Sequence, residues 1–298
     1  NALILVLVEM PKFQFVGRAN SNLTSAVLFS FYIRTQYFRL GEKFMALIKN
    51  EIPILEYDTE QNAIIMPGHG WDYKFTKKEV MLFMEKEIDE YVLIHDCEVV
   101  GEFESITKKF PVYKIIHNGE EIVFCQAPLG GAAATQIMDQ LIGGGAREII
   151  ATGCCGSLID DTEGDFFIPT VALRQEGTSY HYLPPAREVE MNDKAIQAIV
   201  TALENNNLNY RKCKTWTTDG FYRETREMVL YRKEEGCSVV EMECASLAAC
   251  AKMRGVVFGQ LLFTADSLAN VEAHDTRNWG DGTFAVAMKL AFDAVVEV

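Results

Sequence analysis

The sequence lacks the local signatures of several common nucleotide and hydrolase sites. It contains neither a GxxxxGK(S/T) phosphate-binding loop nor a GxSxG nucleophile turn. The nearest approach to a dinucleotide-binding glycine pattern, Gly68-His69-Gly70, has Tyr73 where the third glycine would stand. These absences argue against P-loop enzymes, dinucleotide-dependent dehydrogenases and α/β-hydrolases.

Positive charge is also scarce. The 298 residues include 28 Lys and Arg against 42 Asp and Glu, a formal net charge of −14. Such a surface repels phosphodiester backbones, and no run of basic residues interrupts it, so we expect no nucleic-acid partner. An anionic cosubstrate would have to be held by backbone amides or by a few basic side chains.

Paired CxxC spacings are absent as well, which argues against a structural zinc site, and we expect no metal. The cysteines lie mostly in apolar or helical stretches, as is typical of free thiols in a reducing compartment. We therefore expect a cytoplasmic protein without disulfides. The eight cysteines are Cys97, Cys125, Cys154, Cys155, Cys213, Cys237, Cys244 and Cys250.

The N-terminal segment 1–45 differs from the rest, since it is apolar, aromatic-rich and without alternating strand and helix signals. The apolar run 2–8 is too short to span a membrane, and the run 23–33 is interrupted by serines, so we expect no membrane partner. We interpret this segment as an upstream extension with the native start near Met45. A peripheral helix that covers a subunit surface is the alternative.

Residues 46–298 carry the pattern of one α/β domain with a central mixed sheet flanked by helices. Short β-branched runs alternate with amphipathic stretches from Ile52 onward, without a linker. Asn118-Gly119 predicts a hairpin turn, and Gly130-Gly131 predicts the start of a helix that ends near Ile142. A strand is predicted at 63–66 and a helix from about Thr76, whose hydroxyl would cap it.

Two acidic elements follow predicted strands. Glu241 and Glu243 flank Met242 directly after Val239-Val240, where a carboxylate can accept hydrogen bonds from the two hydroxyls of a ribose. The same spacing also suits a pair of acids at a helix N-terminus. Asp266 follows a strongly apolar strand and can either cap a turn or donate a proton to a heterocyclic nitrogen.

Taken together, five ordered motifs resemble those of the nucleoside phosphorylase and nucleosidase superfamily, from about residue 60 to the end. The segment Gly177 to Pro184 also resembles part of the uridine phosphorylases. The five motifs are Pro67-Gly68, Gly153-Cys-Cys-Gly156, Asp219-Gly-Phe-Tyr222, Val240-Glu-Met-Glu-Cys-Ala-Ser246 and Thr264-Ala-Asp-Ser267.

The resemblance implies a partly barrel-like sheet, a homo-oligomer (dimer, trimer or hexamer), and orthophosphate as cosubstrate without a cofactor. It implies that Glu243 binds the ribose hydroxyls, with Met242 under the sugar and Glu241 beside it. It places Phe221 and Asp219 at the base. Asp266 matches the acid that protonates N7 of a purine.

The chain departs from the family where phosphate is bound. Ala151 stands where an arginine is expected, and Cys154 replaces a hydroxyl. His69 stands in the loop where an acidic residue and a nearby arginine are expected, and we predict a catalytic or anion-binding role for it. His181 is an open case between a site residue and a subunit contact. The predicted substitutes for the phosphate ligands are Gly68, Gly130, Gly131, Cys154 and Arg223.

The sequence therefore favours a nucleoside phosphorylase that cleaves a purine or broad range of nucleosides to free base and ribose 1-phosphate. A nucleosidase, with water in place of phosphate, explains the missing arginines, although no residue matches the glutamate with which such enzymes activate water. A uridine-type phosphorylase and a non-catalytic nucleoside-binding protein on the same fold remain alternatives.

Overall fold

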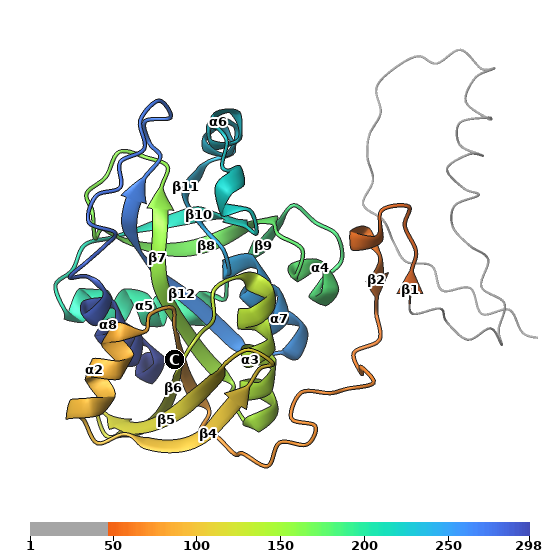
Figure 1. Cartoon of the computed structure of the whole chain (residues 1–298), viewed down its shortest axis with the longest axis vertical. Coiled ribbons are helices and arrows are strands. Elements are labelled where there is room, and N and C mark those ends of the chain that lie inside the picture. The colour runs from red at the N-terminus through yellow and green to blue at the C-terminus, as the bar shows by residue number, and fades with distance from the viewer. Residues whose placement is uncertain (1–46) are drawn as a thin grey trace, which may run out of the picture. The chain divides into compact units, whose positions relative to one another are not determined.

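The computed structural model describes residues 47–298 (Figure 1). The segment 1–45 and the predicted native start lie outside the described residues. A small antiparallel pair precedes the main sheet, formed by β1 (Leu47–Ile48) and β2 (Tyr57–Asp58). Throughout 47–298, no helix combines the length and the apolar character needed to cross a membrane.

The main sheet has ten strands in the order β11-β10-β8-β12-β7-β3-β6-β5-β4, with β9 beside β8. Its strands are β3 (Lys78–Leu82), β4 (Glu98–Glu104), β5 (Lys109–His117), β6 (Glu120–Gln126), β7 (Glu148–Ser157), β8 (Phe166–Gln175), β9 (Glu188–Glu190), β10 (Tyr210–Thr218), β11 (Cys237–Glu241) and β12 (Val257–Ser267).

Part of this sheet closes into a ring. The last residues of β11 pair antiparallel with the end of β7, Val239 with Ser157 and Val240 with Gly156. β7, β12, β8, β10 and β11 are thereby joined into a closed barrel, and β3, β6, β5 and β4 extend from it. The predicted fold class, a mixed and partly barrel-like sheet flanked by helices, is confirmed.

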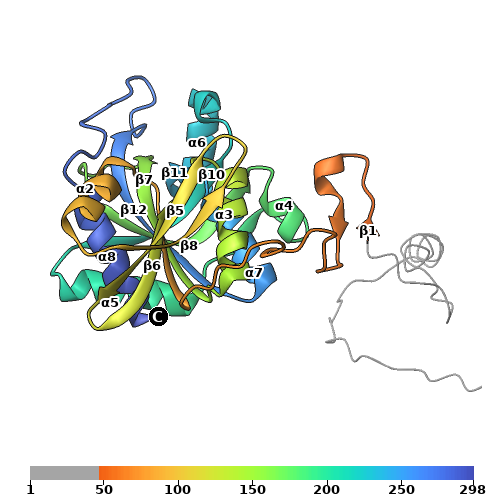
Figure 2. The same cartoon turned by 60° about the horizontal axis from the view of Figure 1, so that its bottom comes forward.

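Helices cover the sheet in two groups. Figure 2 shows α5 and α8 together on one side of the strands and α3, α4 and α7 on the other, as in Figure 1. The helix bounds are α2 (Lys86–Ile94), α3 (Gly131–Gly144), α4 (Ser179–Tyr182), α5 (Asp193–Asn205), α6 (Arg226–Glu234), α7 (Cys244–Arg254) and α8 (Phe284–Glu297). Two short 3-10 helices are η1 (Pro53–Leu55), between β1 and β2, and η2 (Phe221–Arg223), before α6.

Local sequence signals account for several of these elements. Asn118 and Gly119 turn β5 into β6 with φ angles of 51° and 84°, the left-handed conformation that Asn and Gly tolerate best. Asn192 caps α5, since its side-chain oxygen accepts from the amides of Lys194 and Ala195 at 3.0 and 3.4 Å. The predicted hairpin and the predicted helix from Gly130-Gly131 are both confirmed.

The prediction of a helix from Thr76 is wrong, as is that of a strand at 63–66. Lys78–Leu82 forms β3, which pairs in parallel with β6 and β7. Thr76 Oγ1 donates to the carbonyl of Lys78 instead of capping a helix. Because β3 is flanked by strands on both edges and almost entirely buried, its side chains do not alternate, and a local pattern could not identify it.

Candidate active site

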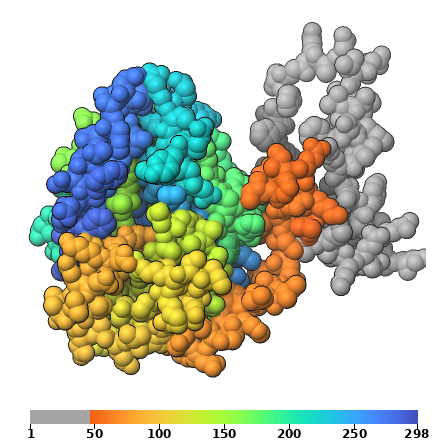
Figure 3. All heavy atoms as spheres, viewed as in Figure 1, coloured from red at the N-terminus to blue at the C-terminus, as the bar shows by residue number. Residues whose placement is uncertain are grey.

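A cavity of about 680 Å³ opens where the barrel closes. It is bordered by the ends of β7, β11 and β12 and by the turn η2. In the space-filling view of Figure 3, the blue segment after β12 and the cyan segment around α6 lie next to each other at the top of the visible face. The lining residues are Leu129, Cys154, Cys155, Gly156, Asp219, Gly220, Phe221, Tyr222, Arg223, Glu224, Val240, Glu241, Met242, Glu243, Ala265, Asp266, Leu268 and Trp279.

Gly156 is the point at which the three strands meet. It pairs with Val240 of β11 and with Asp266 of β12. A Cβ atom at this position would lie 3.1 Å from Val240 Cγ1 and 3.2 Å from Asp266 Oδ1. Glycine is therefore required for β11 and β12 to approach β7 this closely, and this approach brings the two acidic motifs into one cavity.

Both carboxylate oxygens of Glu241 accept hydrogen bonds from other groups of the protein. Its Oε1 accepts from the hydroxyls of Thr217 and Thr215 at 2.6 and 3.2 Å, and its Oε2 accepts from the amides of Glu243 and Cys244 at 2.7 and 2.6 Å. These bonds tie β10 to β11 and satisfy free amides at the start of α7. The prediction that Glu241 binds ribose is thus corrected: the carboxylate holds the strand end and helix start that position its neighbour.

Glu243 is oriented by the backbone. Its Oε1 accepts from the amide of Gly130 at 2.6 Å, and the backbone of Met242 also forms a hydrogen bond with the carboxyl group. Burial raises the pKa of Glu243 to about 8, and the nearby charge of Glu241 adds to the effect. Met242 lines the same cavity between the two acids.

Asp266 stands at the end of β12 with its side chain largely buried and Oδ2 2.7 Å from Nε2 of His274. Glu224, after η2, lies near enough to sense its charge. Burial raises the pKa of Glu224 to about 7, and the negative charge of Asp266 contributes to the shift. Asp266, Glu224 and Glu243 therefore line one cavity, and burial raises the pKa of the two glutamates there.

Aromatic and apolar side chains form the remaining wall. Phe221 is 45% exposed, and its ring centroid lies 4.7 Å from that of Tyr222. Asp219 points back toward the protein, since its Oδ2 accepts from the amide of Gly177 at 2.8 Å. Phe221 thus presents a ring on which a planar base could stack, whereas Asp219 fixes the turn that carries it.

Of the predicted phosphate ligands, Cys154 and Arg223 line the cavity. Burial, followed by the charges of Glu243 and Asp266, raises the pKa of the Cys154 thiol to about 11, so it is a neutral and weak donor. The Gly130 amide is already bonded to Glu243. At Gly131 a Cβ would lie 2.2 Å from Ser246 Oγ, so this glycine permits α3 to pack against α7.

Gly68 and His69 are not in this cavity, which corrects their predicted roles there. The Gly68 amide donates to Gln140 Oε1 at 2.9 Å, and the Cα of Gly68 packs near Gly143, at the C-terminal end of α3. Gly130 precedes the opposite end of this helix, about 20 Å away for 14 residues. His69 is exposed in the same turn. The prediction placed His69 in the loop at the carboxyl end of the first strand of the main sheet. That strand is β3 and not 63–66, so the loop at its carboxyl end follows Leu82.

Three further arginines, each a possible anion ligand by its charge, are engaged elsewhere. Arg174 donates to Ser179 Oγ at 2.8 Å and to the carbonyl of Pro184 at 2.9 Å. Arg187 and Arg226 pair with Glu235 and Glu272. None of the three lines the cavity.

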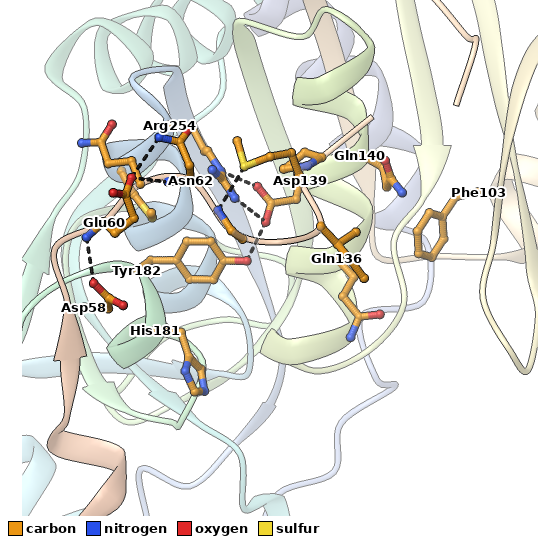
Figure 4. Close-up of a pocket in the computed structure, with 16 residues that line it drawn as sticks. Asp58, Glu60, Asn62, Phe103, Gln136, Asp139, Gln140, His181, Tyr182 and Arg254 are labelled. Carbon is orange, nitrogen blue, oxygen red and sulfur yellow. Dashed lines mark hydrogen bonds and ion pairs between the residues drawn. The ribbon is translucent and has the colours of Figure 1, made fainter. Parts of the chain in front are cut away.

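A second cavity, of about 500 Å³, lies between α3, α4, the end of α7 and the segment before β3 (Figure 4). Its central carboxylate is satisfied by protein groups: Asp139 accepts from Arg254 Nε and from the hydroxyl of Tyr182, both at 2.7 Å. His181 is among its lining residues, away from Glu243 and Asp266. This cavity brings together none of the predicted site residues.

Sequence reasoning missed Glu224 and Trp279, which line the first cavity, and His274, which contacts Asp266 from outside the lining. His274 and Trp279 lie in the irregular segment after β12, where no periodic pattern marks a contact. Glu224 follows η2 within the motif that identified Phe221, but one more acid in a charged segment carries no distinguishing signal. All eight cysteines are free.

The closed sheet thus carries a carboxylate-lined cavity where β7, β11 and β12 meet. The phosphorylase superfamily profile matches residues 79–297, and the chain belongs to this superfamily. It is 26% identical over 170 residues to the guanosine phosphorylase of Halorubrum lacusprofundi, a match that covers 57% of this chain and 69% of that protein.

Two solved structures show the same fold. The AMP nucleosidase from Bacteroides thetaiotaomicron superposes with a TM-score of 0.60 at 24% identity, over 74% of this chain and 88% of that one. The uridine phosphorylase from Vibrio fischeri superposes with a TM-score of 0.66 at 19% identity, over 80% and 98%. The relatives thus include both phosphorylases and a nucleosidase.

Proposed function

We propose that this chain, through a catalytic domain at residues 46–298, cleaves the N-glycosidic bond of a purine nucleoside with orthophosphate, giving free base and ribose 1-phosphate. The supporting observation is that Glu243 and Asp266 line one cavity beside the exposed ring of Phe221. The similarity to a guanosine phosphorylase supports phosphate as the acceptor and a purine as the base.

In this proposal, Glu243 holds the sugar. The Gly130 amide fixes one carboxylate oxygen, and the other accepts hydrogen bonds from the ribose hydroxyls. Met242 packs under the sugar, and Phe221 stacks on the base. The buried carboxylate thereby orients C1′ without forming a covalent bond.

Asp266 acts on the leaving group. As the bond between C1′ and N9 breaks, its electron pair moves onto the base, and the ribose gains oxocarbenium character. Asp266 donates a proton to N7, which neutralises the developing charge, and an oxygen of phosphate forms the new bond to C1′. Pyrimidines lack N7, so this assignment favours purines over the uridine-type alternative.

Hydrolysis is the second candidate, and the charge of the cavity favours it. Among the described residues that line the cavity, Arg223 alone has a full positive charge, against five carboxylic acids. Those acids are Asp219, Glu224, Glu241, Glu243 and Asp266. Phosphate would enter against this field, whereas water is neutral.

An assay with and without phosphate separates the two. Purified protein, freed of phosphate by dialysis, is incubated with purine and pyrimidine nucleosides, and release of free base is followed. Phosphate-dependent release with ribose 1-phosphate, identified by phosphorus NMR, supports the phosphorylase. Phosphate-independent release with free ribose supports the nucleosidase. If a nucleoside binds but none is cleaved under either condition, both enzyme proposals fail and the binding protein remains.

The proposal includes neither a metal nor an organic cofactor. It also includes a homo-oligomer of two, three or six subunits in a reducing compartment, with the cytoplasm as the expected location. Light scattering of the purified protein tests the assembly, since a monodisperse monomer would contradict it.

A further inference from the structure

Proton supply to a buried acid is a physical requirement of the proposed function, on which this inference rests. An aspartic acid in water ionises near pH 3.9 and has little proton to give at neutral pH, whereas a histidine titrates near 6.5. A mechanism in which Asp266 protonates the base therefore needs a neighbouring group that carries a proton and can exchange it with solvent.

His274 meets both conditions by its position. Its Nε2 lies 2.7 Å from Oδ2 of Asp266, which is hydrogen-bond distance for a charged pair. The two side chains differ in exposure: that of Asp266 is 10% accessible to solvent and that of His274 is 45% accessible. The pair thus connects the inner wall of the cavity to water.

The backbone around His274 is held in place by three independent contacts. Asp275 and Ser267 exchange both backbone hydrogen bonds, at 2.9 and 3.0 Å, so the residue after His274 is clamped to the end of β12. Arg277 pairs with the fully buried carboxylate of Asp161 at 2.7 Å. The rings of His274 and Trp279 meet edge to face with centroids 6.0 Å apart. The contact with Asp266 is therefore part of a fixed loop geometry.

We propose that His274 is a positioning residue that reloads Asp266 with a proton from solvent during glycosidic cleavage. Asp266 gives its proton to N7 of the departing base, and the imidazolium form of His274 passes the proton on Nε2 to the carboxylate of Asp266. The neutral imidazole that remains takes a proton from a hydronium ion or a buffer acid in the solvent. One proton enters from solvent for each proton that the base carries away, and His274 itself never touches the nucleoside.

Charged groups of both signs surround the pair. Glu224 lies near Asp266 from the segment after η2, Glu243 faces the cavity from the start of α7, and Asp275 follows His274 in its own loop. Cys154 on β7 is neutral. The opposing positive charges are Arg223 among the described lining residues and Arg277, whose Nε lies 3.8 Å from Asp275 Oδ2.

The test is the pH profile of turnover in the intact chain. We expect His274→Asn and His274→Gln to lower kcat on a purine nucleoside roughly tenfold to a hundredfold at pH 7.5, with KM changed less than about twofold. The loss should shrink as the pH falls toward 5, because proton transfer from the solvent to Asp266 then becomes faster. Added imidazole should restore part of the rate.

His117→Asn is the matched control. His117 Nε2 contacts Asp293 Oδ1 at the same distance, 2.7 Å, between β5 and α8 and outside the cavity. The His117→Asn variant should have the same dependence of kcat on pH and the same response to imidazole as the parent. Unfolding temperatures of all variants show which of the two His274 substitutions retains the parental fold.

A further measurement needs no His274 variant. NMR titration of the His274 ring in the parent and in Asp266→Asn should show a lower apparent pKa when the carboxylate charge is removed. An unchanged titration, or His274 variants that keep the parental profile in an active enzyme, would overturn the inference while leaving the proposed function intact. A loss of kcat that does not depend on pH and is not reversed by imidazole, in a His274 variant that is folded, also overturns the inference. A parent that cleaves no nucleoside overturns the proposed function and this inference with it.

Discussion

Oε1 of Glu243 accepts a hydrogen bond from the backbone amide of Gly130 at 2.6 Å, linking the start of α7 to the start of α3. Gly130 has a φ angle of 92°, in the region that glycine adopts without strain. We predicted the Gly130 amide as a phosphate ligand, but it instead orients the carboxylate that we propose to bind ribose.

Ribose affinity should rise with pH. Burial raises the pKa of Glu243 to about 8, so the ionised form that accepts two hydroxyl hydrogen bonds is the minor form at pH 6.5 and predominates at pH 9. We expect the Kd of a non-cleavable nucleoside analogue, measured by calorimetry, to fall roughly tenfold over that interval. Glu243→Gln should abolish the trend, and a 2′,3′-dideoxy analogue should not show it. Glu224→Gln is the control that should retain it.

Asp266→Asn should reduce kcat on a purine nucleoside by roughly 10²–10⁴, the usual range for loss of a general acid. KM should change much less, since the amide keeps the shape of the side chain. Steady-state kinetics on one purine and one pyrimidine nucleoside checks this. Equal rates for variant and parent would remove Asp266 from the mechanism.

Gly156→Ala should impair turnover without unfolding the protein. The new Cβ would lie 2.9 Å from Leu268 Cδ1 and 3.2 Å from Asp266 Oδ1, so the acid has to move. We expect kcat to fall at least tenfold. Gly177→Ala is the comparison, because its Cβ would meet its nearest neighbours at an ordinary 3.7 Å. If both alanine variants are equally active, the close approach at Gly156 does not position Asp266.

Glu79 should make stability depend on pH. Within residues 47–298, neither carboxyl oxygen has a hydrogen-bond partner, and burial raises the pKa of Glu79 well above the usual range. A raised folded-state pKa gives stability that is complete below the unfolded value near 4.3 and is lost as pH rises through the folded value. Glu79→Met should stabilise the protein by roughly 1–3 kcal/mol at pH 8 and by less at pH 5, as measured by urea unfolding. Glu79→Gln also removes the titration, so its stability relative to the parent should change by the same amount between the two pH values.

Local chemistry made much of the fold predictable. The Asn118-Gly119 turn and the glycine pair before α3 each require a particular backbone conformation, so short sequence signals locate them. β3 shows the limit of this reasoning, because a strand buried between two neighbours carries no alternation and its identity depends on β6 and β7. Because β3 was not identified as a strand, the anion-binding loop was predicted at His69, after residues 63–66, and not after Leu82.

The sequence by itself determined the family-type acids, the place of Glu243 after a strand, and the glycines that permit close packing. Only the tertiary structure decided which groups share a site. The antiparallel pairing of β11 with β7 at Gly156 brings Glu243 and Asp266 into one cavity, although their strands are not adjacent in the sheet. The same structure occupies Glu241 with protein amides and sets His274 against Asp266. Such contacts arise from closure of the barrel and from an irregular loop. Neither feature produces a hydrophobic period in the sequence, so neither can be predicted from a local pattern.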